Sequence, residues 1–182
     1  YIGSVLAVLT IIATSMIYAQ LKTVPRWNHW TTPLLFLLLS LGGGALLALQ
    51  TSIGLILLTF SGVIQLLAWY LGDGRFQRRG TNIGTATGLG DRGKVRAFEP
   101  PHTGNNYLLK EMVHQVGRKH AVKLRVIAFI MMILMPIGLL MISYAVPIVV
   151  LALLVHMVGT FVQRWLFFAE AEHVVGLYYG KR

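Results

Sequence analysis

Three long stretches of this chain carry no charged side chain: residues 1–20, 27–72 and 126–163. A helix that crosses a bilayer needs about 20 mostly apolar residues, and a charge at the membrane centre costs roughly 2.5–3.5 kcal/mol. Burial in a soluble core explains one such stretch, but not three that cover most of the chain. The chain is 55% hydrophobic and only 12% charged, about half the charged fraction of a soluble domain. We therefore predict an all-α, polytopic transmembrane helix bundle that forms a single membrane domain.

The apolar stretches divide into five predicted spans, at about residues 2–21, 32–49, 53–72, 124–142 and 148–169. Pro33 falls in the first turn of the second span, where proline is tolerated. Pro136 lies inside the fourth span and is expected to kink it. The connections are short, except for the long loop 73–123.

The loop 73–123 has two parts of different composition. Its first half is rich in Gly, Thr and Asn, and we expect it to be irregular. In residues 105–123, apolar side chains recur every three or four positions. This spacing predicts an amphipathic helix that lies on the membrane surface.

The positive charges predict the orientation of the bundle. With five crossings, all 16 Lys and Arg residues lie on one side of the membrane, and the loop 73–123 holds most of them. Cytoplasmic segments carry an excess of Lys and Arg, so this side is predicted to be cytoplasmic. A net charge of +10 is also found in nucleic-acid-binding proteins. Beside spanning helices, it is better explained by orientation and by contact with anionic lipid of the bilayer, and no nucleic acid is expected.

Metal and haem sites built by this chain alone are not expected. The chain has no cysteine, which excludes its own iron–sulfur cluster and thiolate zinc site. His102, His114 and His120 share the loop without the i, i+4 spacing of a helical metal site. A b-type haem needs two axial histidines, whereas only His156 lies deep within a span. We predict that His156 forms a hydrogen bond between helices.

Two glycine-rich segments have simpler explanations than a ligand site. Residues 88–94 satisfy a G-x-G-x-x-G pattern and nearly a P-loop. However, no strand precedes them, and Val95 stands where the P-loop needs Ser or Thr. The run 42–44, three glycines in the second span, permits close helix packing. It also leaves room for a flat cofactor headgroup.

Aromatic and ionisable side chains gather near the charged ends of the predicted spans. The aromatic ones fit an interfacial belt: Trp27, Trp30, Trp69, Tyr70, Trp165, Tyr178 and Tyr179. Arg164, Glu170, Glu172 and His173 lie at the edge of the apolar zone, where ionisable groups are functional candidates. A quinol site needs an apolar slot, a hydrogen-bond partner and a proton acceptor. This group offers the polar parts of such a site, although Arg164 and Glu170 also fit side chains that reach from a helix end to the interface.

Residues 16–33 combine Tyr18 near a helix end, a Thr-Val-Pro turn at 23–25, Trp27 and a Trp-x-Thr-Pro sequence from Trp30, before a glycine-rich helix. This arrangement resembles the membrane anchor subunits of dimethyl sulfoxide reductase-type molybdopterin oxidoreductases. The ending at 159–168, in which an arginine follows a glycine, is similar to the last helix of that family. Loop residues 86–90 and 94–104 resemble the branch that includes the anchor of membrane-bound sulfite dehydrogenase.

The resemblance implies a role in a larger complex. Family members have eight spans, and the five here correspond to the last five. The start at Tyr1 inside an apolar run agrees, so we expect earlier helices. An anchor of this family holds an iron–sulfur subunit and a molybdopterin catalytic subunit at the bacterial inner membrane and exchanges electrons with the quinone pool. The family's best-known quinol-site residues lie in the earlier helices, and none is transferred to this chain.

We predict that the chain does no substrate chemistry itself and binds quinone near its charged face. The candidate quinone-binding residues are Tyr18, Arg26, Trp27, His29, Trp30, Arg164, Glu170 and His173. The candidate docking residues for the partner subunits are Arg75, Arg78, Arg79, Lys94 and Arg96. Two alternatives remain at this stage: a di-haem cytochrome b-type anchor that oxidises quinol, and a small-molecule transporter.

Overall fold

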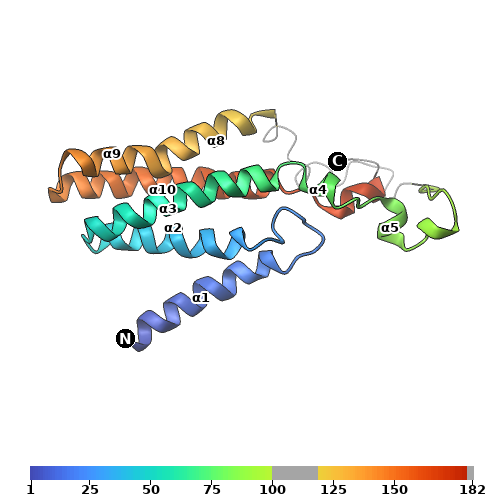
Figure 1. Ribbon diagram of the computed structural model, residues 1–182, viewed down its shortest axis with the longest axis horizontal. Helices are drawn as coiled ribbons and strands as arrows, with labels where there is room; N and C mark the ends of the chain where they lie inside the picture. The colour runs from blue at the N-terminus through green and yellow to red at the C-terminus, as the bar shows by residue number, and fades with distance from the viewer. Residues whose placement is uncertain (100–118, 180–182) are drawn as a thin grey trace.

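The computed structural model describes residues 1–99 and 119–179, and this part of the chain is all-helical, without a strand (Figure 1). The long elements are α1 (Ile2–Ala19), α2 (Thr31–Leu47), α3 (Thr51–Gly72), the continuous α8–η2–α9 (Ala121–Ile142) and α10 (Val146–Ala169). Four of these are long and apolar enough to cross a membrane, and α2 is shorter, with 17 residues. The prediction of an all-α bundle is confirmed.

The fourth helical stretch switches from an α-helix to a short π-helix ahead of Pro136. It consists of α8 (Ala121–Phe129), the π-helical η2 (Ile130–Leu134) and α9 (Met135–Ile142). Proline has no N–H, so it cannot donate to the carbonyl of Met132, four residues earlier. The Met132 oxygen lies 2.7 Å from Nδ1 of His156 in α10. The predicted hydrogen bond of His156 between helices is confirmed.

The helices pack as two hairpins with α1 at the side (Figure 1). Helices α2 and α3 pair closely, and α10 packs along α8, η2 and α9 and also contacts α2. Helix α1 contacts chiefly α2 and diverges from the bundle toward the N-terminus. A buried core joins the two hairpins and consists of Leu39, Leu46, Leu58, Met132, Ile133, Leu140, Val149 and Ala152. Gly42, in the predicted close-packing run, lies against Leu58.

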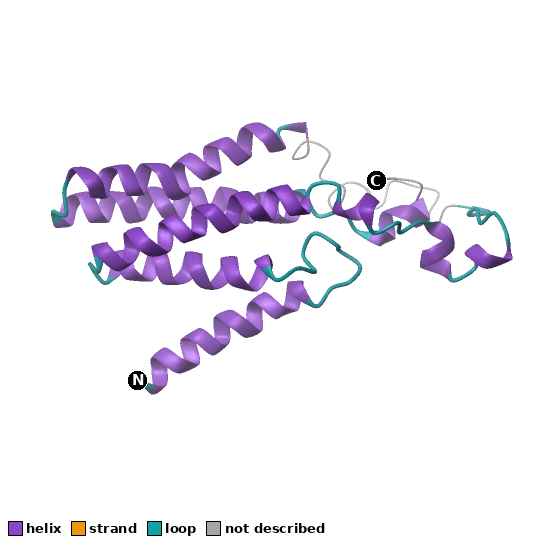
Figure 2. Cartoon of the chain, in the orientation of Figure 1, coloured by secondary structure: helices purple, strands orange, loops and turns teal. Residues whose placement is uncertain are grey.

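Short helices and loops gather at one end of the bundle, hereafter the loop end (Figure 2). They include α4 (Arg75–Arg78), α5 (Ile83–Thr87), η1 (Gly90–Arg92) and η3 (Val174–Tyr179). The expectation of an irregular first half of the loop was therefore wrong in part. The Asn82 side chain accepts a hydrogen bond from the Thr85 N–H, and Thr85 Oγ1 accepts one from the Asn82 N–H, which caps α5. The amphipathic helix predicted at 105–123 lies almost wholly outside the described residues.

Candidate functional site

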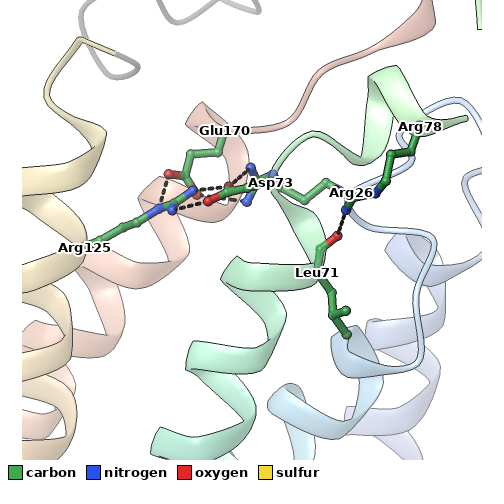
Figure 3. A network of polar contacts seen from close by, with 6 residues as sticks. All are labelled: Arg26, Leu71, Asp73, Arg78, Arg125 and Glu170. Atoms are coloured by element: carbon green, nitrogen blue, oxygen red, sulfur yellow. Dashed lines mark hydrogen bonds and ion pairs between the residues drawn. The ribbon is translucent and has the colours of Figure 1, made fainter. Parts of the chain in front are cut away.

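Four charged side chains from four separate segments meet at the loop end (Figure 3). Arg26 follows α1, Asp73 ends α3, Arg125 lies in α8 and Glu170 ends α10. Arg125 donates to both oxygens of Asp73, at 2.7 and 2.8 Å, and its Nε donates to Glu170 Oε1 at 2.6 Å. Arg26 reaches Asp73 at 2.7 Å and Glu170 at 3.4 Å. We call these four residues the ion-pair network.

The ion-pair network is only partly exposed to solvent. The Glu170 side chain is 7% exposed, whereas the Asp73 side chain is 50% exposed. Hydrogen bonds from Arg125, and then from Arg26, lower the pKa of Asp73 to about 2, although burial opposes this shift. Each carboxylate contacts both guanidinium groups, so removing one member leaves a neighbouring charge incompletely paired. The network therefore fixes the ends of three helices and the α1–α2 loop relative to one another.

An aromatic cluster lies next to the network, on the side of α1. Trp27 stacks on Phe167 with ring centroids 5.0 Å apart, and its Nε1 donates to the Phe167 carbonyl at 2.9 Å. Tyr18 contacts Trp27, Phe36 and Phe167 at centroid distances of 5.2, 5.8 and 5.4 Å. The predicted Tyr18 and Trp27 are thus brought together as packing aromatics, each partly buried.

Arg164 lies inside the bundle rather than reaching outward to the interface. Its guanidinium carbon is 3.9 Å from the centre of the Phe36 ring and 5.3 Å from that of Phe167. A cation over an aromatic face is attracted by the ring quadrupole. Its Nη1 is buried and has no hydrogen-bond partner, and no carboxylate of the described residues lies within ion-pair distance. Arg164 therefore presents a free hydrogen-bond donor and an unneutralised charge.

A small, partly open cavity, which we call the chamber, lies between α2, α3 and α10. Its volume is about 40 Å³. Besides Arg164, two buried amides, Gln65 and Gln163, each have a side-chain oxygen without a partner within the described structure. The chamber is lined by Arg26, Thr31, Thr32, Leu35, Phe36, Gln65, Ala68, Trp69, Gln163, Arg164, Phe167 and Glu170.

A larger apolar groove runs along α2 and α10 and shares Phe36 and Arg164 with the chamber. Its volume is about 460 Å³, within the range typical of small-molecule sites. From Phe36 to Leu47 along α2 it extends over about 17 Å, at 1.5 Å per residue. Gly43 and Gly44 form part of its wall, and His156 lies beside Gly43. In the glycine run 42–44, Gly42 therefore packs closely on α3, while Gly43 and Gly44 leave space for the groove, and both effects were suggested by the sequence.

The remaining candidate quinone-binding residues lie away from the groove. His29 Nδ1 is 2.9 Å from Thr31 Oγ1, and burial, with the nearby charge of Arg75, lowers the pKa of His29. The neighbouring Trp30 is exposed. His173 is exposed too, and its Nδ1 accepts a hydrogen bond from the Val175 N–H. Of the eight predicted residues, the structure places Arg26, Arg164 and Glu170 on the chamber and only Arg164 on the groove.

The candidate docking arginines bond partly within their own chain. Arg79 donates to the Lys22 carbonyl at 3.2 Å, and Arg78 donates to the Leu71 carbonyl at 2.6 Å (Figure 3). Arg75 is half-buried and donates to the Asn28 carbonyl at 3.4 Å. Lys94 and Arg96 are exposed. Docking of partner subunits at these residues stays a prediction.

Sequence reasoning missed the two glutamines and half of the ion-pair network. Gln65 and Gln163 are polar residues inside otherwise apolar spans, a signal that was available. Asp73 and Arg125 lie at the boundaries of the predicted loop 73–123 and the predicted span 124–142, and neither was singled out. Their pairing joins positions 52 residues apart, which composition and spacing do not reveal.

Comparison with known proteins gives a relative of known name. The chain is 27% identical to the C subunit of sulfite dehydrogenase from Allochromatium vinosum over 193 aligned positions, which cover 98% of this chain and 59% of that protein. The chain thus spans about three fifths of the length of the curated relative it matches. No protein-family model matches the chain. No solved structure matches it either.

Proposed function

We propose that this chain is a membrane anchor subunit of a dimethyl sulfoxide reductase-type molybdoenzyme of the bacterial inner membrane, in the sulfite dehydrogenase branch. It holds an iron–sulfur subunit and a molybdopterin catalytic subunit and exchanges electrons with the quinone pool. The observation that carries this proposal is the similarity to the sulfite dehydrogenase C subunit along almost the whole chain. The apolar helices with a polar loop end support it.

The groove is the best candidate for quinone binding. A quinone has a flat ring with two carbonyl oxygens and an apolar tail. The apolar wall of the groove suits the tail. Arg164 lines the groove, and its Nη1, which has no hydrogen-bond partner among the described residues, suits a carbonyl oxygen, which can only accept hydrogen bonds. A quinone bound there would exchange electrons with the iron–sulfur subunit. This chain's residues hold the ring near the loop end and balance the charge it gains.

Co-purification tests the anchor role. The tagged chain, purified from its native membrane, should bring down two further subunits that contain molybdenum and iron. Sulfite should then reduce an added quinone analogue. If the chain purifies without metal-containing partners, the anchor proposal fails.

The variant Arg164→Met tests the groove as the quinone site. Loss of a charge-assisted hydrogen bond costs about 1.5–3 kcal/mol, so the KM for quinone should rise roughly ten- to hundredfold. Reduction of a soluble dye by the partner subunits should be unchanged. Arg92→Met is the matched control, because Arg92 is exposed in η1. An unchanged KM in Arg164→Met would place the quinone elsewhere.

A further inference from the structure

Three cavities share lining residues in succession, from the groove to the loop end. The groove and the chamber share Phe36 and Arg164. The chamber shares Arg26 and Glu170 with an open cleft of about 590 Å³, whose other lining residues include Arg78 and Glu172. We propose that the chamber holds water and conducts a proton between the loop end and the groove. This inference rests on the proposed function, because the proton acceptor is a quinone in the groove.

The chamber has the size and the chemistry for water. A water molecule needs about 10–15 Å³ of such volume, so 40 Å³ accommodates about three. Empty cavities in proteins are apolar, whereas this one is lined by Gln65, Gln163 and Arg164. Within the described structure, the side-chain oxygens of both glutamines and the Nη1 of Arg164 are buried without a hydrogen-bond partner. A buried polar atom without a hydrogen bond is costly. Water that donates to the two oxygens and accepts from Arg164 removes this cost for all three atoms.

The polar atoms come from two helices that belong to different hairpins. Gln65 lies in α3, with 2% of its surface exposed, and Gln163 lies in α10, with 3% exposed. The hydroxyl-bearing Thr31 and Thr32 of α2 also line the chamber. Apolar side chains at these glutamine positions would fill the same space with no hydrogen-bonding demand. Their presence in spans that are otherwise apolar points to a role for the water they hold.

The charge of Arg164 determines the form in which the proton moves. A fixed cation repels a hydronium ion but attracts the negative charge that a quinone oxygen gains on reduction. At the oxygen facing Arg164, a neutral chamber water therefore gives the proton. Its O–H bond breaks, the new O–H bond forms on the quinone oxygen, and hydroxide leaves toward the cleft, where bulk protons neutralise it. The electrons come from the iron–sulfur subunit of the proposed complex.

The exit lies beside the ion-pair network. The contact of 3.4 Å between Arg26 and Glu170 is the longest of the four ion pairs, and both residues face the chamber as well as the cleft. The Glu170 carboxylate remains bonded to Arg125 at 2.6 Å. Water can therefore pass at the Arg26 contact without breaking the rest of the network.

Hydroxyl-radical footprinting of the purified complex tests for the water itself. X-ray radiolysis oxidises side chains next to bound water, and Leu35 lines the chamber with only 5% of its surface exposed. Leu35 should be oxidised well above Leu58, which is fully buried outside the chamber. Ala68→Val, which narrows the chamber, should lower the oxidation of Leu35 to that of Leu58. Gln50→Leu, at an exposed site in the α2–α3 turn, should not.

Quinone reduction by the same complexes tests the proton path. Gln65→Leu and Gln163→Leu should each lower kcat by about a hundredfold, the lower range for positioned proton transfer. The KM for quinone and the reduction of a soluble dye should stay unchanged. Gln50→Leu should match the wild type. Sulfite, and in a second arm a reduced viologen, supplies the electrons.

The two measurements separate the possible failures. If Leu35 is not oxidised, or if kcat is unchanged in both glutamine variants, the water path is wrong while quinone reduction by the wild type still supports the proposed function. If the wild-type complex reduces no quinone with either donor but Leu35 is oxidised, the proposed function and the proton path fail together and only the water site stands.

Discussion

At the scale of single residues, Asp73 shows how the loop end responds to acid. Its pKa falls from an ordinary 3.8 to about 2, first because of the hydrogen bonds from Arg125. A pKa that is lower in the folded state means that the ionised group stabilises the fold. This contribution is fully present above the ordinary pKa and is lost as the pH falls toward 2. Half of the side chain is exposed, so solvent weakens the effect.

The variant Asp73→Asn should therefore be less stable than the wild type at neutral pH. The difference between their melting temperatures in detergent should shrink as the pH falls from about 4 to about 2, where the wild-type carboxyl becomes protonated. Asp91→Asn, at an exposed aspartate of η1, is the control. A difference that stays constant with pH would mean that the charge of Asp73 does not stabilise the fold.

His156 illustrates a residue whose role is clear only from its partner. A carbonyl oxygen accepts hydrogen bonds and cannot donate, so His156 Nδ1 must carry the hydrogen that bonds Met132. The sequence predicted a helix–helix hydrogen bond. It did not indicate that the acceptor would be the carbonyl of Met132, four residues before Pro136. The pairing depends on how α10 and η2 align, which a single sequence does not reveal.

At the scale of elements, the contact of α10 with η2 depends on Gly159. A Cβ atom at this position would collide with the backbone nitrogen of Met132 and lie 2.6 Å from the Met131 carbonyl carbon. Backbone atoms cannot move aside as a flexible side chain does. Gly159→Ala should therefore push the helices apart and destabilise the protein by about 1–3 kcal/mol.

Gly138→Ala is the matched control, because nothing lies within 4 Å of a Cβ at this position of α9. Replacing glycine by alanine in an open helical position stabilises the helix by about 1 kcal/mol. In detergent, the melting temperature of Gly159→Ala should therefore lie below that of the wild type, and the melting temperature of Gly138→Ala should lie above it. If Gly159→Ala has the same melting temperature as the wild type, α10 and η2 are not in close contact.

The helices were predictable from sequence, because each depends on local composition. The predicted 148–169 corresponds to α10 (Val146–Ala169), and 53–72 to α3 (Thr51–Gly72). The short helix α5 was missed, since its cap at Asn82 is a side-chain contact within a segment rich in glycine and threonine. The chamber was missed because it needs polar side chains from three helices to converge, although Arg164, which lines it, was among the residues singled out from the sequence.

At the scale of the whole molecule, the basic residues of the loop end bear on assembly. The exposed Lys94 and Arg96 are free of the intrachain contacts that Arg78 and Arg79 make. The double variant Lys94→Glu and Arg96→Glu therefore reverses two charges without breaking a described contact. If partner subunits dock here, less of them should co-purify with the tagged chain, and the loss should grow with salt, because charge pairs at an interface are screened.

Charge reversal at Arg75, Arg78 and Arg79 should release the partners more completely. It also breaks hydrogen bonds to the carbonyls of Lys22, Asn28 and Leu71. The melting temperature of the isolated chain must therefore be measured as well, to distinguish loss of docking from loss of stability. Partner subunits that stay bound in both sets of variants would exclude the loop end as the docking face.

The orientation of the chain in the membrane follows from the number of crossings between labelled positions. Among the described residues between Thr87 and Ala145, one helical stretch, Ala121–Ile142, is long and apolar enough to cross a membrane. Its 22 residues give a helix of about 33 Å, which matches the roughly 30 Å hydrocarbon core.

The chain has no cysteine, so Thr87→Cys and Ala145→Cys each introduce a unique thiol. An impermeant maleimide should label them from opposite sides of the membrane, with Thr87→Cys accessible from the cytoplasm. Lys22→Cys, two crossings before Thr87, should react from the same side as Thr87→Cys. Labelling of Thr87→Cys and Ala145→Cys from one side would mean that α8–η2–α9 does not cross the bilayer. The loop end could then not be assigned to the cytoplasmic side, and a path from the loop end through the chamber to the groove would no longer run from the cytoplasm into the membrane.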